Sequence, residues 1–120
     1  MNAVAAWIAG VRLGIEGHLM ASSLTAFSGT SRRFEFKGEN GGRRLYDDYA
    51  HHPTEVAAAI TQARSAAGNG EVSVVFQPHL YSRTQSFAGR FADALSHADH
   101  VYVCDIYGAR EDPVPGVDST

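Results

Sequence analysis

The sequence predicts an α/β fold in which a parallel sheet is flanked by helices. Three observations predict it. Two helical segments come first, a Gly-rich turn then separates two extended runs, and strand-like and helical patterns alternate from there to the end. Strands that alternate with helices pair in parallel through right-handed crossovers. We therefore expect an α/β parallel sheet with flanking helices and an N-terminal β-hairpin, preceded by a helix pair. The chain stops after its third such strand, so we expect an incomplete domain.

Composition excludes several classes of protein. The 120 residues include 10 Lys and Arg against 13 Asp and Glu, a net charge of −3, which does not suit a nucleic-acid binder held by phosphate contacts. The single cysteine, Cys104, excludes an internal disulfide and suits a reducing compartment, and we expect a buried structural thiol there. No apolar run is long enough to span a bilayer and no signal peptide is visible, so we expect a cytoplasmic protein without membrane contact.

The first helix is predicted over Asn2–Leu13, with Gly14 as its C-terminal cap. A second, shorter helix is predicted over His18–Ala26. Each has an apolar face, formed in the first by Val4, Ile8, Val11 and Ile15, and in the second, facing inward, by Leu19, Met20, Leu24 and Phe27. The polar stretch that follows marks the end of a structural unit, which we place at residues 1–30.

The hairpin is predicted by a change of period. Arg33–Lys37 alternates polar and aromatic residues, and Arg43–Tyr49 is a second extended run. The residues between them, 38–42, are Gly-rich. The two extended runs and the Gly-rich segment between them predict a hairpin with a loop longer than two residues.

The alternating part opens with a helix that begins at Pro53, has Glu55 in its first turn and is buried through Val56, Ile60, Ala63 and Ala67. Val72–Phe76 is nearly all apolar, as expected of a strand covered on both faces. Ser82–Gln85 has the form of a capping box and opens a helix with a stripe of Phe87, Phe91, Ala94 and Leu95. Val101–Ile106 is the last strand. We expect Leu45–Tyr49, Val72–Phe76 and Val101–Asp105 to be parallel neighbours in one sheet.

Polar side chains follow each of these strands. Open α/β sheets bind ligands beyond the carboxyl ends of their strands, so one site is predicted at that edge. The three groups are Asp48, Tyr49, His51 and His52; Gln77, His79 and Arg83; and Asp105, Tyr107, Arg110 and Glu111.

Each group also has a plainer interpretation. The stretch 47–55 fits either ligand contact or a helix cap with solvated charges. Arg83 and the helix N–H groups near it would favour an anion, or Arg83 simply lies in water. A zinc site of His51, His52 and His79 is disfavoured, because adjacent side chains diverge and the sequence has neither a Cys pair nor HExxH. A phosphate-cradling loop is missing too, since Lys37, the only lysine, precedes a glycine.

Long motifs carry a resemblance to a known family. The runs DDYAHHPTEV, VFQPHLYSRT and ADHVYVCDIYGAREDPVPGV, with NAVAAWIAGVRLGI and FSGTSRRFEFKG upstream, occur in this order and cover nearly the whole chain. They resemble the Mur ligases of peptidoglycan synthesis, and among these the ligases that join L-alanine to UDP-N-acetylmuramate.

The resemblance implies a part of a three-domain enzyme. Residues 1–30 correspond to the last helices of the central, ATP-binding domain, and residues 31–120 to the N-terminal part of the C-terminal domain, which the resemblance implies is Rossmann-like. The parent enzyme uses ATP and Mg²⁺ to convert the UDP-N-acetylmuramate carboxylate into an acyl phosphate, which L-alanine attacks. The Walker loop and the magnesium-binding glutamate of the family lie outside this sequence. The chain alone is therefore expected to be inactive, with no catalytic residue and no metal ligand of its own.

Six residues take a role from the resemblance. Asn2 corresponds to an asparagine that contacts adenine, Arg33 to an arginine at the nucleotide, and Asp48 to an aspartate that binds the ribose hydroxyls. Tyr49, His51 and Arg83 correspond to residues around the incoming alanine, whose carboxylate an arginine can pair with in bidentate fashion. The sequence departs from the family pattern at Leu80, where many members have arginine.

Two other interpretations use the same residues. One is a free-standing small α/β module that binds a nucleotide or a partner without chemistry. The other is a metal-dependent hydrolase that uses Asp48, His51 and His79.

Overall fold

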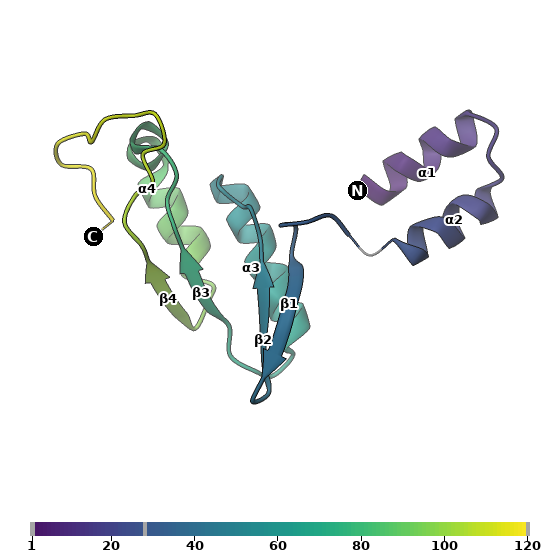
Figure 1. Cartoon of the computed structure of the whole chain (residues 1–120), viewed down its shortest axis with the longest axis horizontal. Helices are drawn as coiled ribbons and strands as arrows, with labels where there is room; N and C mark the ends of the chain where they lie inside the picture. Colours follow the sequence, from purple (N-terminus) through teal and green to yellow (C-terminus); the bar gives the residue numbers. More distant parts are fainter. Residues whose placement is uncertain (1, 28, 120) are drawn as a thin grey trace. The chain divides into compact units, whose positions relative to one another are not determined.

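A computed structural model describes residues 2–27 and 29–119, and the chain divides into two compact units, Met1–Ser31 and Arg32–Thr120 (Figure 1). The first unit is a pair of helices, α1 (Asn2–Arg12) and α2 (Gly17–Ala26). The indole Nε1 of Trp7 donates a hydrogen bond of 2.9 Å to the carbonyl of Gly17. Gly14, with a φ of +90°, ends the first helix as predicted.

The apolar residues of this helix pair are only partly covered within the unit. Leu19 is 50% exposed and Phe27 63% exposed, so the prediction that both face inward is wrong. Two short helices meet along one line of contact, and one line cannot cover a wide apolar face on each of them.

The second unit begins with an antiparallel hairpin of β1 (Glu35–Asn40) and β2 (Arg43–Asp47). Asn40 pairs with Arg43, so the turn consists of Gly41 and Gly42 alone. Both glycines have positive φ, 56° and 76°, which is the conformation of a tight hairpin turn. The predicted longer loop is therefore wrong, because two successive glycines allow the shortest connection.

The rest of this unit is α3 (Pro53–Ala67), β3 (Ser73–Phe76), α4 (Tyr81–Leu95) and β4 (His100–Val103). The strands β3 and β4 pair in parallel, as predicted. However, β2 pairs with β1 and not with β3, so the described strands form two separate two-stranded sheets instead of one larger sheet. Two-stranded ribbons twist strongly, and the register shift between Phe36 and Gly38 adds a bulge that twists the hairpin further.

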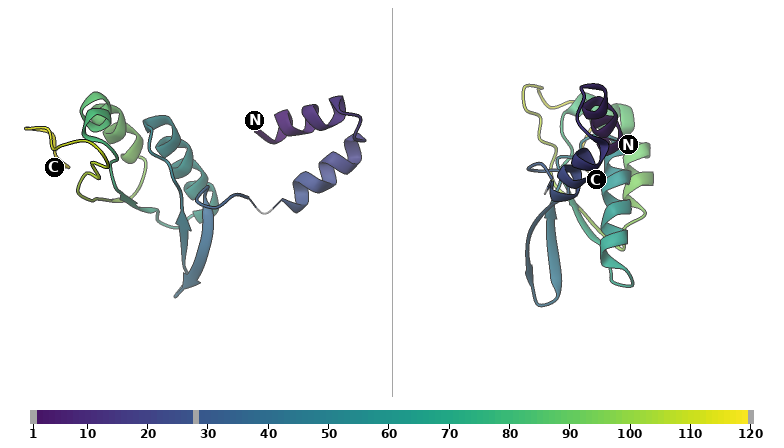
Figure 2. Two further views of the ribbon diagram at one scale, coloured as in Figure 1. Left: turned by 45° about the horizontal axis from the view of Figure 1, so that its top comes forward. Right: turned by 90° about the vertical axis from the view of Figure 1, so that its right-hand side faces the viewer.

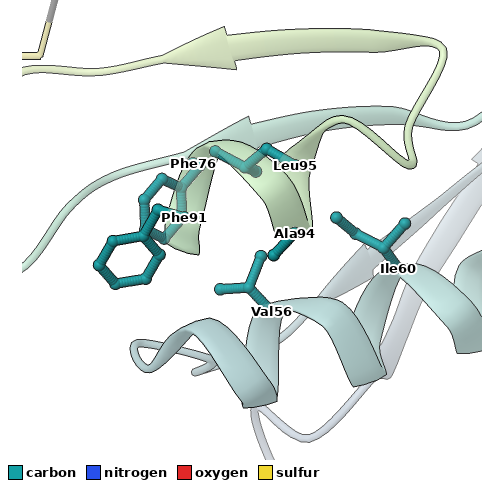
Figure 3. Packing of buried hydrophobic residues seen from close by; sticks show 6 residues of the cluster. All are labelled: Val56, Ile60, Phe76, Phe91, Ala94 and Leu95. Atoms are coloured by element: carbon teal, nitrogen blue, oxygen red, sulfur yellow. The ribbon is translucent and has the colours of Figure 1, made fainter. Parts of the chain in front are cut away.

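The hydrophobic core lies between α3, α4 and the sheet of β3 and β4. Both helices lie on one face of that sheet (Figure 2). Phe76 and Phe91 meet with ring centroids 5.1 Å apart, and the cluster is completed by Val56, Ile60, Ala94 and Leu95 (Figure 3). This confirms the main part of both predicted helix stripes.

The strand β3 is covered on one face only, in contrast to the prediction. Val75 is 72% exposed, whereas Phe76 is 7% exposed. Alternation of this kind is expected where helices pack on a single face of a sheet. Cys104 also differs from the prediction: it follows β4 and is exposed.

An ion pair ties three segments of this unit together. Asp99 accepts hydrogen bonds from a guanidinium nitrogen of Arg64 at 2.6 Å and from the backbone N–H of Val72 at 2.7 Å. Arg64 also donates to the carbonyl of His97. The hydrogen bond from Arg64, followed by that from Val72, lowers the pKa of Asp99 to about 2. The end of α3 is thereby joined to the start of β3 and to the turn before β4.

No helix in the described part of the chain is long and apolar enough to cross a membrane.

Candidate functional site

A groove of about 460 Å³ lies at the carboxyl ends of the strands. Segments that follow β2, β3 and β4 all contribute to it, so the structure brings together parts of the three polar groups that the sequence singles out. The polar and aromatic side chains along it are Arg32, Asp47, Asp48, Tyr49, His51, Gln77, His79 and Tyr107.

Asp48 joins two stretches of backbone at one end of the groove. Its Oδ2 accepts a hydrogen bond of 2.7 Å from the N–H of Phe34, and its Oδ1 accepts one of 2.7 Å from the N–H of Ala50. A carboxylate offers about four acceptor positions in all. Asp48 thus positions the backbone before β1 and after β2, and each oxygen keeps capacity for a further donor.

Tyr49 lies beside two nitrogen-containing side chains. The guanidinium carbon of Arg32 is 4.6 Å from the centre of its ring, and the N–H of Tyr49 donates to the carbonyl of Arg32 at 2.9 Å. The ring of His51 meets Tyr49 edge-on at 5.3 Å. Arg32 lines the groove, although the sequence assigned it no role. Arg33, which the resemblance places at the nucleotide, is not a lining residue, and its charge acts on Glu55. Only the fold distinguishes which of two adjacent side chains faces the groove.

His51 and His52 point to different partners, as predicted for adjacent residues. Nδ1 of His51 is 2.9 Å from the carbonyl of Tyr49 and 3.4 Å from Glu55. His52 instead caps α3: its Nδ1 accepts from the N–H of Thr54, and its ring packs against Phe87 at 5.1 Å. A histidine cap has no strong sequence signal, and it was missed.

Glu55 completes the capping box of α3. Its Oε2 accepts from the N–H groups of His51 at 3.0 Å and of His52 at 3.2 Å. The hydrogen bond from the His51 backbone is the main cause that lowers the pKa of Glu55, opposed by desolvation and aided by the charges of His51 and Arg33. Glu55 is therefore ionised near neutral pH and fixes the segment that carries His51.

His79, which lines the groove, links Arg83 to Tyr107. A terminal nitrogen of Arg83 is 3.3 Å from Nδ1 of His79, which accepts because guanidinium has only donors. The ring of His79 lies 5.6 Å from that of Tyr107, and the two residues form an isolated parallel bridge. Arg83 does not line the groove itself. It is half-buried behind His79.

The start of α4 differs from the prediction in two ways. The N-cap is Leu80, with a φ of +74°, and it makes no side-chain cap. Ser82 is not a capping residue but donates through both its N–H and its hydroxyl to Glu111. The N–H of Ser82 that was expected to attract an external anion is already bonded to a carboxylate of the same chain.

Two predictions, the role of Asn2 and a metal centre, do not correspond to any feature of the groove. Asn2 is in the first unit and its side chain lies outside the described residues. Among the residues that the structure does describe, no three or more His, Cys, Asp or Glu side chains form a group that could hold a metal ion. Asp48, His51 and His79 therefore do not form the metal centre that the hydrolase interpretation requires.

Comparisons with known proteins agree on one family. Residues 32–120 match the family described as "Mur ligase, glutamate ligase domain". The chain is 59% identical over 119 residues to UDP-N-acetylmuramate–L-alanine ligase of Arthrobacter sp. (strain FB24), a match that covers 99% of the chain and 26% of that protein. It is 60% identical over 116 residues to the ligase of the same name from Saccharopolyspora erythraea, covering 97% of the chain and 24% of that protein.

A solved structure gives the same result. The crystal structure of UDP-N-acetylmuramate-alanine ligase from Thermotoga maritima superposes with a TM-score of 0.76 at 32% identity, covering 88% of this chain and 23% of that one. The α/β fold predicted from the sequence is therefore confirmed. The chain spans about a quarter of the length of the curated relatives it matches.

Proposed function

The chain belongs to the Mur ligase family, and from that premise we propose that it is part of an ATP-dependent ligase that joins L-alanine to UDP-N-acetylmuramate in peptidoglycan synthesis. The observation that carries the proposal is the 59% identity to a ligase of that name over almost the whole chain. We place residues 1–30 at the end of the ATP-binding domain and residues 31–120 at the start of the C-terminal domain. The division into units near residue 31 supports this boundary. We also propose a cytoplasmic location, which the free thiol of Cys104 supports.

ATP, with Mg²⁺, would supply the phosphoryl group that activates the substrate carboxylate. The residues of this chain fit the ribose part of the nucleotide, because each oxygen of Asp48 has accepting capacity left after its backbone hydrogen bond. We assign Arg33 and Asn2 to the same ligand. The Mg²⁺ ligands belong to the rest of the enzyme in this proposal.

L-alanine is assigned to the groove between Tyr49, His51 and Arg83. Its carboxylate needs a cation with several donors, and a guanidinium supplies a planar pair of them. Arg83 does not line the groove itself, but it contacts His79, which does. Tyr49 and His51 line the groove, and their rings meet edge-on. The small apolar side chain of alanine is assigned to the space between the aromatic rings.

A chimaera tests the proposal. The segment of the Arthrobacter ligase that this chain matches is replaced by residues 2–120 of this chain, and phosphate release is measured with UDP-N-acetylmuramate, ATP and L-alanine. We expect turnover that depends on alanine, within about tenfold of the unmodified ligase. The same ligase with the segment deleted is the control and should be inactive. A folded chimaera that releases phosphate with another amino acid but not with alanine would refute the substrate assignment.

A further inference from the structure

The helix α4 begins without a cap from its own sequence. Leu80 at the N-cap position has an apolar side chain and a φ of +74°, a conformation that L-residues rarely adopt. The first N–H groups of any helix need partners from outside the helix. At this helix the partner for Ser82 comes from residue 111, 29 positions later in the chain.

Both carboxylate oxygens of Glu111 accept hydrogen bonds from Ser82. Its Oε2 accepts from the N–H of Ser82 at 2.9 Å, and its Oε1 accepts from the Ser82 hydroxyl at 2.5 Å. Hydrogen bonds to an ionised acceptor are short and strong. The hydroxyl of Ser82, then its backbone, with smaller contributions from the backbone of Tyr81 and the charge of Arg83, lower the pKa of Glu111 against the effect of desolvation. Glu111 is therefore a carboxylate throughout the neutral range.

The 107–111 loop closes on the same helix end through several other contacts. Within the loop, the N–H of Glu111 donates to the carbonyl of Gly108 at 2.9 Å, which makes the loop a tight turn. A Cβ on Gly108 would lie 2.9 Å from the ring of Tyr81, so the loop packs against that ring without room for a side chain. The other end of the loop, Tyr107, exchanges backbone hydrogen bonds with Pro78 and Leu80 at 2.8 and 2.9 Å.

We propose that Glu111 is a positioning residue of the candidate site: by holding the 107–111 loop on the start of α4, it fixes Tyr107 against His79 and thereby the place of Arg83. A continuous series of contacts leads from Glu111 to Tyr107. Glu111 bonds Ser82, which adjoins Arg83, and Arg83 contacts His79, which forms a parallel bridge with Tyr107. Glu111 itself does not line the groove, so it acts through these residues and not on the ligand. What the site binds rests on the proposed function, whereas the positioning does not.

The first test uses this chain without any ligand. Amide resonances are compared between the wild type, Glu111→Ala and the neighbouring exposed control Asp112→Ala. We expect Glu111→Ala to move the amides of residues 79–83 and 107, while those of the β1–β2 hairpin stay in place and Asp112→Ala leaves both regions unchanged. Glu111→Gln keeps an oxygen that can accept from Ser82 and should move the same amides less. Shifts confined to residues 110–112 in Glu111→Ala would overturn the proposal.

The second test measures kinetics in the chimaera described above. Glu111→Ala should raise the KM for alanine about tenfold or more and leave the KM for ATP within about twofold, with partial recovery in Glu111→Gln. Equal changes in both KM values, in step with a fall in Tm, would show a merely structural role and overturn the proposal. If the unmutated chimaera does not use alanine, the proposed function fails, and the ligand-free spectra still decide the role of Glu111.

Discussion

Asp48 shows how one side chain can hold the site together and still be available to a ligand. Its two oxygens each accept one backbone N–H, from Phe34 and from Ala50, which lie 16 positions apart. Each of these bonds contributes about 1 kcal/mol to stability, and more because the acceptor is charged. A ligand hydroxyl would use the remaining lone pairs. Replacing Asp48 is therefore expected to change both stability and ligand binding, which must be measured separately.

We expect substitutions at Asp48 and Arg83 to separate the two substrates. In the chimaera, Asp48→Ala should raise the KM for ATP by on the order of tenfold or more, since a hydrogen bond to a charged group is worth roughly 1.5–3 kcal/mol. Arg83→Ala should mainly raise the KM for alanine. Steady-state kinetics with each substrate varied in turn would check this, with Tm as the measure of structural loss. Unchanged alanine kinetics in Arg83→Ala would contradict the assignment of that residue.

Single residues were predicted well where their neighbours in sequence decide their role. Pro53 and Glu55 begin α3 as expected, because a helix start is a local pattern. Glu111 as the partner of Ser82 could not be predicted in the same way. The capping box expected at Ser82 was locally reasonable, but a carboxylate from a distant loop binds that hydroxyl instead.

At the scale of elements, the helices and strands were found in the order expected, and their pairing was only half predictable. The periodic stripes of α3 and α4 follow from sequence alone, and the core confirms most of their residues, although Ala63 and Ala67 lie outside it. Whether β2 joins β3 depends on the twist of a hairpin whose turn and bulge are set by glycines at 38, 41 and 42. The twist of a hairpin is the sum of small rotations over several residues, and no local pattern in the sequence predicts it.

The Asp99–Arg64 ion pair makes a prediction for this scale. A carboxyl group whose pKa is about 2 in the folded chain and about 3.9 when unfolded stabilises the fold above pH 4. This contribution is lost as the pH falls through about 2. Asp99→Asn should therefore lower Tm by a few °C at pH 6, and the difference from the wild type should shrink below about pH 4 and vanish near pH 2.

Thermal unfolding followed by circular dichroism between pH 2 and pH 7 measures this difference. Asp112→Asn removes an exposed carboxylate of the same kind and is the matched control. A difference between Asp99→Asn and the wild type that stays constant over the whole pH range would show that the charge of Asp99 contributes nothing.

At the scale of the whole molecule, the chain combines the candidate groove with a sequence that has no phosphate-binding loop. The sequence contains no Gly-rich loop followed by lysine and serine or threonine, and its only lysine, Lys37, pairs with Glu35 on β1. The isolated chain should therefore release no phosphate from ATP above a blank, with or without UDP-N-acetylmuramate and alanine. A malachite-green assay measures this, with the chimaera as the positive control. Alanine-dependent phosphate release by the isolated chain would contradict the proposal that the rest of the enzyme supplies the phosphate-activating groups.

The one-sided sheet of β3 and β4 leaves an apolar face exposed to other copies of the chain in solution. Val75 and Tyr102 are 72% and 62% exposed on it, and in the described part of the chain β4 pairs with β3 alone. An apolar strand with a free row of backbone groups is a template on which another strand can add. Glu71 and Asp105 flank these strands and carry negative charge, as gatekeeper residues do beside aggregation-prone segments. Removal of Glu71 and Asp105 is therefore expected to lower the solubility of the chain.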